Sequence, residues 1–421
     1  MLAVERAGLA QAGAAAQFGS RGDTGPPLLL GQGLAIVDRT VINARRSSPL
    51  GTMPKTLAFA TERTTVAPAM NRRSFIGKVG RGALGVSAAG GVLAEGAVFG
   101  ADKKPRAKNW TWTDGGEKLK PEEQKRRFKQ FREAGINAVL FSSFNADVLA
   151  CAKDNGLETH AWTWALCRGD KELLQKHPDW YDVNRIGESA ADKPAYVNYY
   201  HFLCPSHPQV GDHLARVVSD LGDTANLDGI HLDYIRYPDV ILPVALWKKY
   251  NLVQNEELPK FDYCYCEVCR NAFKQQTGED PLKLPDPPAN AAWRQFRYDS
   301  VTKLVNRMVE VAHGKRKQIT AAVFPTPTLA KKMVRQDWVH WNLDAVLPMV
   351  YHSFYNEQPE WIEGAVREGV TALPKDRPLY AGLYLPDLKG DDFDRAVAFA
   401  MAGGAQGVSL FGGVRTIKSR R

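Results

Sequence analysis

The chain has 421 residues, of which 44% are hydrophobic and 10% aromatic, and these values are typical of a globular protein with a sizeable core. The net charge of +9 is concentrated at one end, because residues 1–101 hold 11 Lys and Arg against five Asp and Glu, which leaves +3 for the rest. A nearly balanced surface without a basic arm excludes nucleic acid as the main partner.

The N-terminal 101 residues are predicted to direct export and not to belong to the folded domain. Arg72 and Arg73 are followed by a polar residue and the apolar pair Phe75-Ile76, a pattern that resembles the twin-arginine consensus. The Gly- and Ala-rich stretch 82–99 that follows is too weakly hydrophobic for a stable membrane span. We therefore predict a signal peptide at 70–101, the export machinery as the partner of the precursor, and a periplasmic or secreted mature protein.

Residues 1–69 precede this signal and show no sustained hydrophobic periodicity. Twin-arginine signals lie at an N-terminus, and Met70 stands directly before the motif. Residues 1–69 are therefore interpreted as a disordered leader or as an over-extended gene start.

From residue 105 onwards the sequence repeats one pattern, in which a short apolar strand is followed by a loop and an amphipathic helix. Strands are expected at 109–113, 137–142, 158–166, 227–234, 319–324, 344–351, 379–385 and 407–411. Helices are expected at 121–134, 146–155, 208–221, 292–313, 329–341, 360–369 and 392–402. A Pro- and Cys-rich insertion at 239–290 delays the helix that follows the fourth strand.

Eight such units predict an α/β fold, a single (β/α)8 TIM barrel over 105–415 with an insertion after strand four. Alternating strands and helices force the strands to pair in parallel. A doubly wound open sheet is the alternative, but eight units without a phosphate-cradling Gly-rich loop fit it poorly.

In a TIM barrel the reactive groups lie at the carboxyl ends of the strands. Side chains alternate along the fourth strand, so His231 and Asp233 share one face while Ile230 and Leu232 share the other. The apolar face must meet the helices, which directs His231 and Asp233 into the barrel lumen. Asp228, at the opposite end of the strand, is expected to be structural.

Segment 227–238, which contains Asp233 and Arg236, resembles the strand-four signature of glycosyl-hydrolase-like family 10 and related bacterial barrel proteins. Shorter matches support the resemblance over about 105–415, namely 110–112, 177–180, 203–208, 348–351 and 407–411. The resemblance implies a glycoside hydrolase with a carbohydrate substrate, in which the strand-four aspartate is the nucleophile and strand five or six supplies the acid. It implies no organic cofactor.

Glycosidic cleavage requires two carboxyl groups that flank the bond. Asp233 is the candidate for one of them, and Arg236 is expected to keep it ionised, although Asp233 can also be a salt-bridged structural acid. Strand five ends without an acid, so Glu357 after strand six is predicted to be the second carboxylate. The alternative reading of Glu357 is a charge at a helix N-terminus. The rival carboxylates are Asp387, Asp114 and Glu188.

Aromatic residues gather near the same strand ends, where sugar rings can stack on them while polar edges bind the hydroxyls. Taken singly, each of these aromatics can also be a core residue. The predicted substrate-binding residues are Trp112, Trp164, His231, Tyr234, Arg236, Tyr351 and Tyr384.

Three cysteines in the insertion, Cys264, Cys266 and Cys269, have a C-x-C-x-x-C spacing that resembles the structural zinc cluster of family 42 β-galactosidases. Cys204 is the expected fourth ligand of a structural zinc ion. Four thiolates close the coordination shell, so such a site is not catalytic. Disulfides in an oxidising compartment, or free thiols, remain the alternatives.

These features together predict an exported glycoside hydrolase that cleaves glycosidic bonds in a poly- or oligosaccharide. A non-catalytic glycan-binding barrel is one alternative. A metal-dependent carbohydrate deacetylase is another, with His160, His231, Asp233 and His352 as its ligands.

Overall fold

The structure is a computed structural model that describes residues 107–418. The leader predicted at 1–69 and the export signal predicted at 70–101 lie outside these residues. Within the described part, none of the helices combines the length and the apolar character needed to cross a membrane.

Eight parallel strands form a nearly closed barrel, in the order β6-β5-β4-β3-β2-β1-β8-β7. Between β6 and β7 the closure consists of isolated bridges, Val346 to Leu379 and Met349 to Gly382. The predicted TIM barrel is therefore confirmed, with each strand within three residues of its expected bounds. The strands are β1 Trp110–Thr113, β2 Ala138–Phe141, β3 Glu158–Trp164, β4 Gly229–Asp233, β5 Gln318–Val323, β6 Ala345–Pro348, β7 Ala381–Tyr384 and β8 Val408–Phe411.

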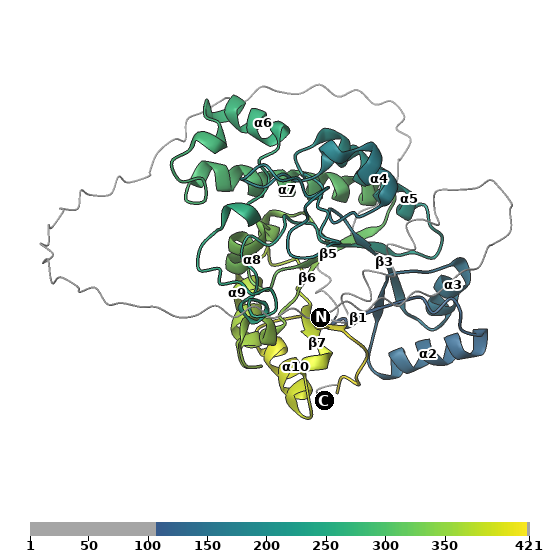
Figure 1. The fold of residues 1–421 in the computed structure, drawn as a ribbon. Coiled ribbons are helices and arrows are strands. Elements are labelled where there is room, and N and C mark those ends of the chain that lie inside the picture. The colour runs from purple at the N-terminus through teal and green to yellow at the C-terminus, as the bar shows by residue number, and fades with distance from the viewer. Residues whose placement is uncertain (1–106, 419–421) are drawn as a thin grey trace, which may run out of the picture. The chain divides into compact units, whose positions relative to one another are not determined.

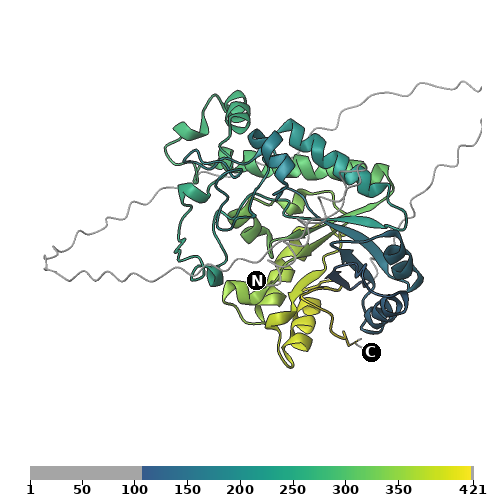
Figure 2. The ribbon, with the colours of Figure 1, turned by 45° about the vertical axis from the view of Figure 1, so that its right-hand side comes forward.

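Helices surround this barrel (Figure 1), and the 45° turn of Figure 2 shows the same ring from a second side. Helix α2 packs against α3, α5 against α7, and α9 against α10. Each buries one apolar stripe, as in α2, where Phe128 and Phe131 face the core. The helices that follow the strands are α2 Pro121–Glu133, α3 Ala146–Asp154, α5 Pro208–Gly222, α7 Ala291–Gly314, α8 Pro327–Val334, α9 Trp361–Ala372 and α10 Asp392–Ala402.

Three segments differ from the prediction. Helix α8 ends at Val334 and not at residue 341, because Arg335 adopts a left-handed backbone with φ 58° and its buried side chain pairs with Glu257. Helices α4 Lys171–Lys176 and α6 Glu267–Thr277 lie in stretches that were expected to be loop or insertion. No helix follows β8 in the described residues, which end at 418.

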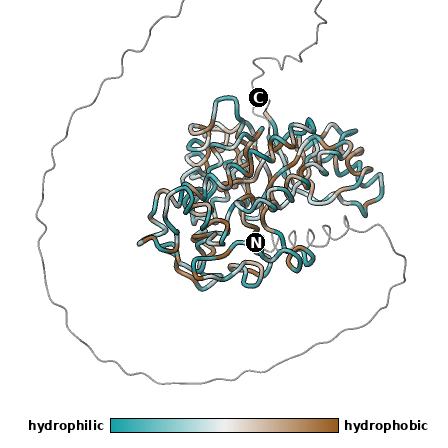
Figure 3. The backbone as a smooth tube through the Cα atoms, turned by 90° about the horizontal axis from the view of Figure 1, so that it is seen from above, coloured by the Kyte–Doolittle hydropathy of each residue, from teal (hydrophilic) through white to brown (hydrophobic). Residues whose placement is uncertain are grey.

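The lumen of the barrel is a packed core and not a channel. The Trp110 and His160 rings form one layer, with centroids 4.9 Å apart, and Trp112 and His231 form the next at 5.5 Å. His231 also makes a 2.8 Å hydrogen bond between Nδ1 and the Oγ1 of Thr320. Hydrophobic stretches run through the interior of the molecule, and hydrophilic ones lie mainly along its outside (Figure 3). This packed core supports the side chains and loops at the carboxyl ends of the strands.

A buried charge network attaches the insertion 239–290 to the barrel. Asp262, fully buried in the insertion, pairs with Arg297 of α7 and lies 3.8 Å from the Arg335 guanidinium. Burial raises the pKa of Asp262, but the two arginines outweigh it and hold this pKa below its usual value. Because removing one member would leave a buried charge unpaired, the network fixes the insertion in one position.

Asp228 occupies the opposite end of the barrel, as its place in the strand predicted. Its carboxylate lies 2.7 Å from the Lys153 ammonium and accepts a 2.8 Å hydrogen bond from the Thr159 backbone N–H. Asp228 therefore joins α3, β3 and β4, which is a structural role.

Candidate active site

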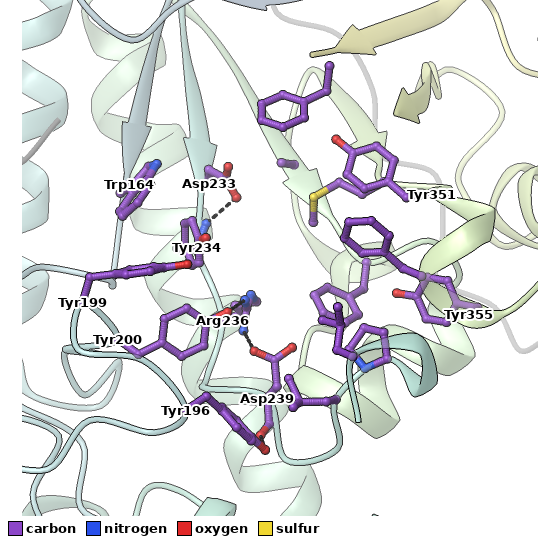
Figure 4. A pocket seen from close by; sticks show the side chains of 18 of the residues that line it. Trp164, Tyr196, Tyr199, Tyr200, Asp233, Tyr234, Arg236, Asp239, Tyr351 and Tyr355 are labelled. Carbon is purple, nitrogen blue, oxygen red and sulfur yellow. Dashed lines mark hydrogen bonds and ion pairs between the residues drawn. The ribbon is translucent and has the colours of Figure 1, made fainter. Parts of the chain in front are cut away.

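A pocket that opens to solvent lies at the carboxyl ends of the strands. Its inner part consists of residues on the strands or just beyond them, namely Trp112, Trp162, Trp164, Asp233, Tyr234, Ala322, Phe324, Met349, Tyr351 and Phe411. Its outer part comes from the loops after β3, β4 and β6, namely Tyr196, Tyr199, Tyr200, Arg236, Asp239, Leu242, Pro243, Leu246, Tyr250, Phe354 and Tyr355. Figure 4 shows Asp233 beside Trp164 at the strand ends, with Tyr196 and Asp239 at the far side.

Asp233 ends β4 and points into the inner part of the pocket. One carboxylate oxygen accepts a 3.0 Å hydrogen bond from the Trp162 indole N–H, and the other accepts a 2.7 Å hydrogen bond from the Tyr234 backbone N–H. The enclosure raises the pKa of this carboxyl above its usual value, although the two N–H donors and the more distant Arg236 oppose the shift. The side chain is thus fixed in direction and retains its proton to higher pH than an ordinary aspartate.

Arg236 forms an ion pair with Asp239 and not with Asp233. Its guanidinium donates at 2.9 Å to the Asp239 carboxylate and at 3.3 Å to the Tyr200 hydroxyl. It also lies 5.1 Å from the centre of the Tyr234 ring. Arg236 therefore does not hold the pKa of Asp233 below its usual value as expected, because it pairs with Asp239 and the burial of Asp233 outweighs its more distant charge. Asp233 is not a salt-bridged structural acid either.

Most residues predicted to bind substrate do line the pocket: Trp112, Trp164, Tyr234, Arg236 and Tyr351. Two others lie outside its lining. His231 is fully buried below it, against Trp112, and Tyr384 lies behind Tyr351 with ring centroids 5.5 Å apart.

The predicted second carboxylate, Glu357, is exposed in the loop between η7 (His352–Tyr355) and α9, outside the pocket lining. Its three rivals are also away from the pocket. Asp387 accepts a hydrogen bond from Ser353, Asp114 pairs with Arg127, and Glu188 pairs with Lys193. The pocket lining contains two carboxylates, Asp233 and Asp239.

Sequence reasoning missed Asp239 and the three tyrosines of the outer part, Tyr196, Tyr199 and Tyr200. All four lie on irregular loops, where no periodic pattern shows which way a side chain points. The tyrosine cluster between 196 and 200 was a usable signal, since aromatic residues concentrated in a loop after a barrel strand suggest a binding surface.

The four cysteines of the predicted cluster meet beside the insertion. Cys204, Cys264, Cys266 and Cys269 are buried, and their sulfur atoms all lie within 4.8 Å of one another. Cys204 lies 3.6 Å from the Cys266 sulfur and 3.4 Å from that of Cys269. These separations exceed a disulfide bond of about 2.05 Å, and all six cysteines are free. The cluster can hold a metal ion.

The histidine ligands that a deacetylase would need are not brought together. Within residues 107–418 the four cysteines form the one group of Cys, His, Asp and Glu side chains that can hold a metal. His160 instead bonds to Glu158 at 2.7 Å at the base of the barrel, and His231 bonds to Thr320.

No protein-family model and no curated protein matches this chain. Solved structures do match it. The PgaB (BpsB) glycoside hydrolase domain from Bordetella bronchiseptica aligns with a TM-score of 0.50 at 12% identity, over 73% of this chain and 94% of that domain. A β-galactosidase from the haloarchaeon Halorubrum lacusprofundi aligns with a TM-score of 0.51 at 14% identity, over 72% and 52%.

The fold is that of glycoside hydrolase barrels. The chain spans nearly all of the PgaB domain but only about half the length of the β-galactosidase. At these identities the likeness extends to the fold and no further, so function has to be argued from the pocket itself.

Proposed function

We propose that this protein is an exported glycoside hydrolase and that it cleaves a glycosidic bond of a poly- or oligosaccharide or another glycoside in the pocket. One observation carries the proposal. Asp233 ends β4 at the carboxyl side of a barrel shared with glycoside hydrolases, it faces an aromatic pocket, and two N–H groups hold it in place.

Asp233 is best suited to donate the proton. A carboxyl that holds its proton more tightly than an ordinary aspartate is better suited to transfer it to the leaving oxygen as the glycosidic bond breaks, and the raised pKa of the enclosed Asp233 supports this role. The Trp162 and Tyr234 N–H groups then stabilise the carboxylate that remains. This assignment differs from the nucleophile role implied by the family resemblance.

Asp239 is our candidate for the second carboxylate, in place of Glu357. It is the other carboxylate in the pocket lining, and its ion pair with Arg236 fixes its position.

The test is the substitution Asp233→Asn, which preserves shape but removes the acidic proton. We expect glycoside turnover to fall by about 10²- to 10⁴-fold while substrate binding and the melting temperature change little. Asp228→Asn is the matched control, since it removes a carboxylate that directly precedes the same strand, at the structural end of the barrel. Unchanged turnover in Asp233→Asn would show that β4 does not supply the acid.

The second carboxylate is tested in the same assay. Asp239→Asn should lower turnover strongly, whereas Glu357→Gln should leave it within about twofold, because Glu357 is exposed and outside the pocket lining. A strong loss in Glu357→Gln with none in Asp239→Asn would reverse the assignment.

A glycan-binding protein without hydrolytic activity is the second candidate function. The observation that favours it is that Asp239 is tied to Arg236, which leaves Asp233 as the one carboxylate in the lining without an ion pair. Saturable glycan binding without release of any reducing sugar, over a panel of substrates, would support this alternative.

We also propose that the four-cysteine cluster holds structural zinc. Tetrahedral zinc with Zn–S bonds of about 2.3 Å places its sulfur ligands about 3.8 Å apart, close to the separations of 3.4 and 3.6 Å from Cys204. The backbone N–H groups of Val183 and Cys266 donate to the Cys264 sulfur, as expected around a thiolate ligand. Zinc here would connect the loop after β3 to the insertion after β4.

A further inference from the structure

We propose that the outer part of the pocket binds an apolar aglycone, so that the bond cleaved joins a sugar to an aromatic or aliphatic group and not to a second sugar. This inference rests on the proposed function and names its substrate class. It departs from the poly- or oligosaccharide substrate predicted from the sequence.

The polar groups of the pocket belong to large aromatic side chains, apart from Asp233, Arg236 and Asp239. Of the described residues that line it, none is Asn, Gln, Ser, Thr, His, Lys or Glu, so its remaining polar atoms are tyrosine hydroxyls and indole N–H groups. Each hydroxyl that a bound sugar buries without a hydrogen-bond partner costs free energy. A chain of several sugars carries more hydroxyls than an apolar aglycone and would face this cost more often.

Polar groups in the outer part are largely satisfied within the protein. The Tyr196 hydroxyl donates to the Asp239 carbonyl oxygen at 2.7 Å and accepts from Gln254 at 2.9 Å. The Arg236 guanidinium bonds to the Asp239 carboxylate and to the Tyr200 hydroxyl. With its one cation neutralised in this way, the outer part has no group suited to an acidic sugar.

An aliphatic wall completes the outer part. Leu242, Pro243 and Leu246 come from the start of the insertion, where the short helix η3 (Val244–Leu246) packs against η7. Phe354 and Tyr355 of η7 face the same space. Burial of an aromatic or aliphatic group against these side chains is favourable, because it removes apolar surface from water.

The inner part of the pocket differs from the outer part, because it combines a polar group with aromatic faces, as a sugar-binding site requires. It carries the Asp233 carboxyl, set among aromatic faces on which one sugar ring can stack. One sugar placed between Asp233 and Asp239, with its leaving group directed against the wall formed by η3 and η7, satisfies both parts of the pocket.

The experiment measures binding to the Asp233→Asn protein by calorimetry, so that it does not depend on turnover. The probes are 2-naphthyl β-glycosides of glucose, galactose and N-acetylglucosamine, the β-linked disaccharides with the same non-reducing sugars, and free 2-naphthol. We expect the best naphthyl glycoside to bind at least tenfold more tightly than its disaccharide, and 2-naphthol to compete with it.

Leu246→Ser should weaken naphthyl glycoside binding by about five- to tenfold. Val244→Ser is the matched control, because Val244 belongs to the same short helix but is exposed and does not line the pocket. Leu246→Ala repeats the test should the serine variant lower the melting temperature.

Disaccharides that bind as tightly as naphthyl glycosides, or equal effects of Leu246→Ser and Val244→Ser, would overturn the inference. If 2-naphthol binds and responds to Leu246→Ser but no glycoside is ever hydrolysed, the apolar site stands and the hydrolase proposal fails. The two ideas are thereby separated.

Discussion

Two aspartates line one pocket in different surroundings. Asp233 has N–H donors and no ion pair, whereas Asp239 is paired with a buried arginine. The sequence allowed the orientation of Asp233 to be derived, because alternation along a strand determines which face is buried. It did not reveal that Arg236 pairs three residues onward, since that depends on how the loop after β4 turns.

Glu158, at the base of the barrel, makes stability depend on pH. Burial raises its pKa, but hydrogen bonds from His160 and Lys108 outweigh burial and lower the pKa from 4.5 to about 2. A carboxyl with a lowered pKa in the folded state stabilises fully above about pH 4.5, and this stabilisation is lost as the pH falls towards 2.

Glu158→Gln should therefore lower the free energy of unfolding by about 2 kcal/mol at pH 7, a value reduced from the full pKa shift because the side chain is 22% exposed. The difference from the parent protein should shrink between pH 4.5 and 2 in urea titrations. Glu133→Gln, on an exposed pair with Lys129, is the control and should have little effect. A gap that stays constant down to pH 2 would contradict the proposed linkage.

Among the elements, the strands were the most predictable. Short apolar runs with glycine-terminated helices between them, such as the helix that ends before Gly135, determined both their order and their approximate ends. Helix α6 was missed because its segment had been assigned to a cysteine-rich insertion. Its N-cap is Cys266 and its first turn contains Cys269, so this helix is arranged around the thiolate cluster, which periodicity does not reveal.

At the same scale, the cysteine cluster connects two loops that also form the outer part of the pocket. Cys269→Ser should abolish stoichiometric zinc binding and lower the melting temperature, because the energy of metal binding contributes to folding. Chelator should lower the melting temperature of the parent protein but not that of the variant. Cys151→Ser, on α3 and outside the cluster, is the control. Parent protein purified without any metal would refute the zinc proposal.

At the scale of the whole molecule, the prediction concerns export of the precursor. Replacing Arg72 and Arg73 by lysine should leave the precursor in the cytoplasm, because the export machinery reads the arginine pair. The pair Arg45-Arg46 provides a matched control, and its replacement by lysine should not change delivery. Cell fractionation followed by immunoblotting measures both. Undiminished periplasmic delivery of the first variant would refute a twin-arginine signal.

The join between β6 and β7 has few hydrogen bonds, and this affects where the barrel unfolds locally. Only the bridges at Val346 and Met349 cross it, so separating these two strands breaks fewer hydrogen bonds than separating β3 from β4, whose ladder pairs five residues. Local unfolding starts where such bonds are few, and we expect the β7 amides to exchange with deuterium before those of β3. Tyr351, which lines the pocket, follows β6, and Tyr384 ends β7, with their ring centroids 5.5 Å apart across this join. Transient parting of the strands would therefore widen the pocket from the side, giving a bulky ligand a route that bypasses the mouth.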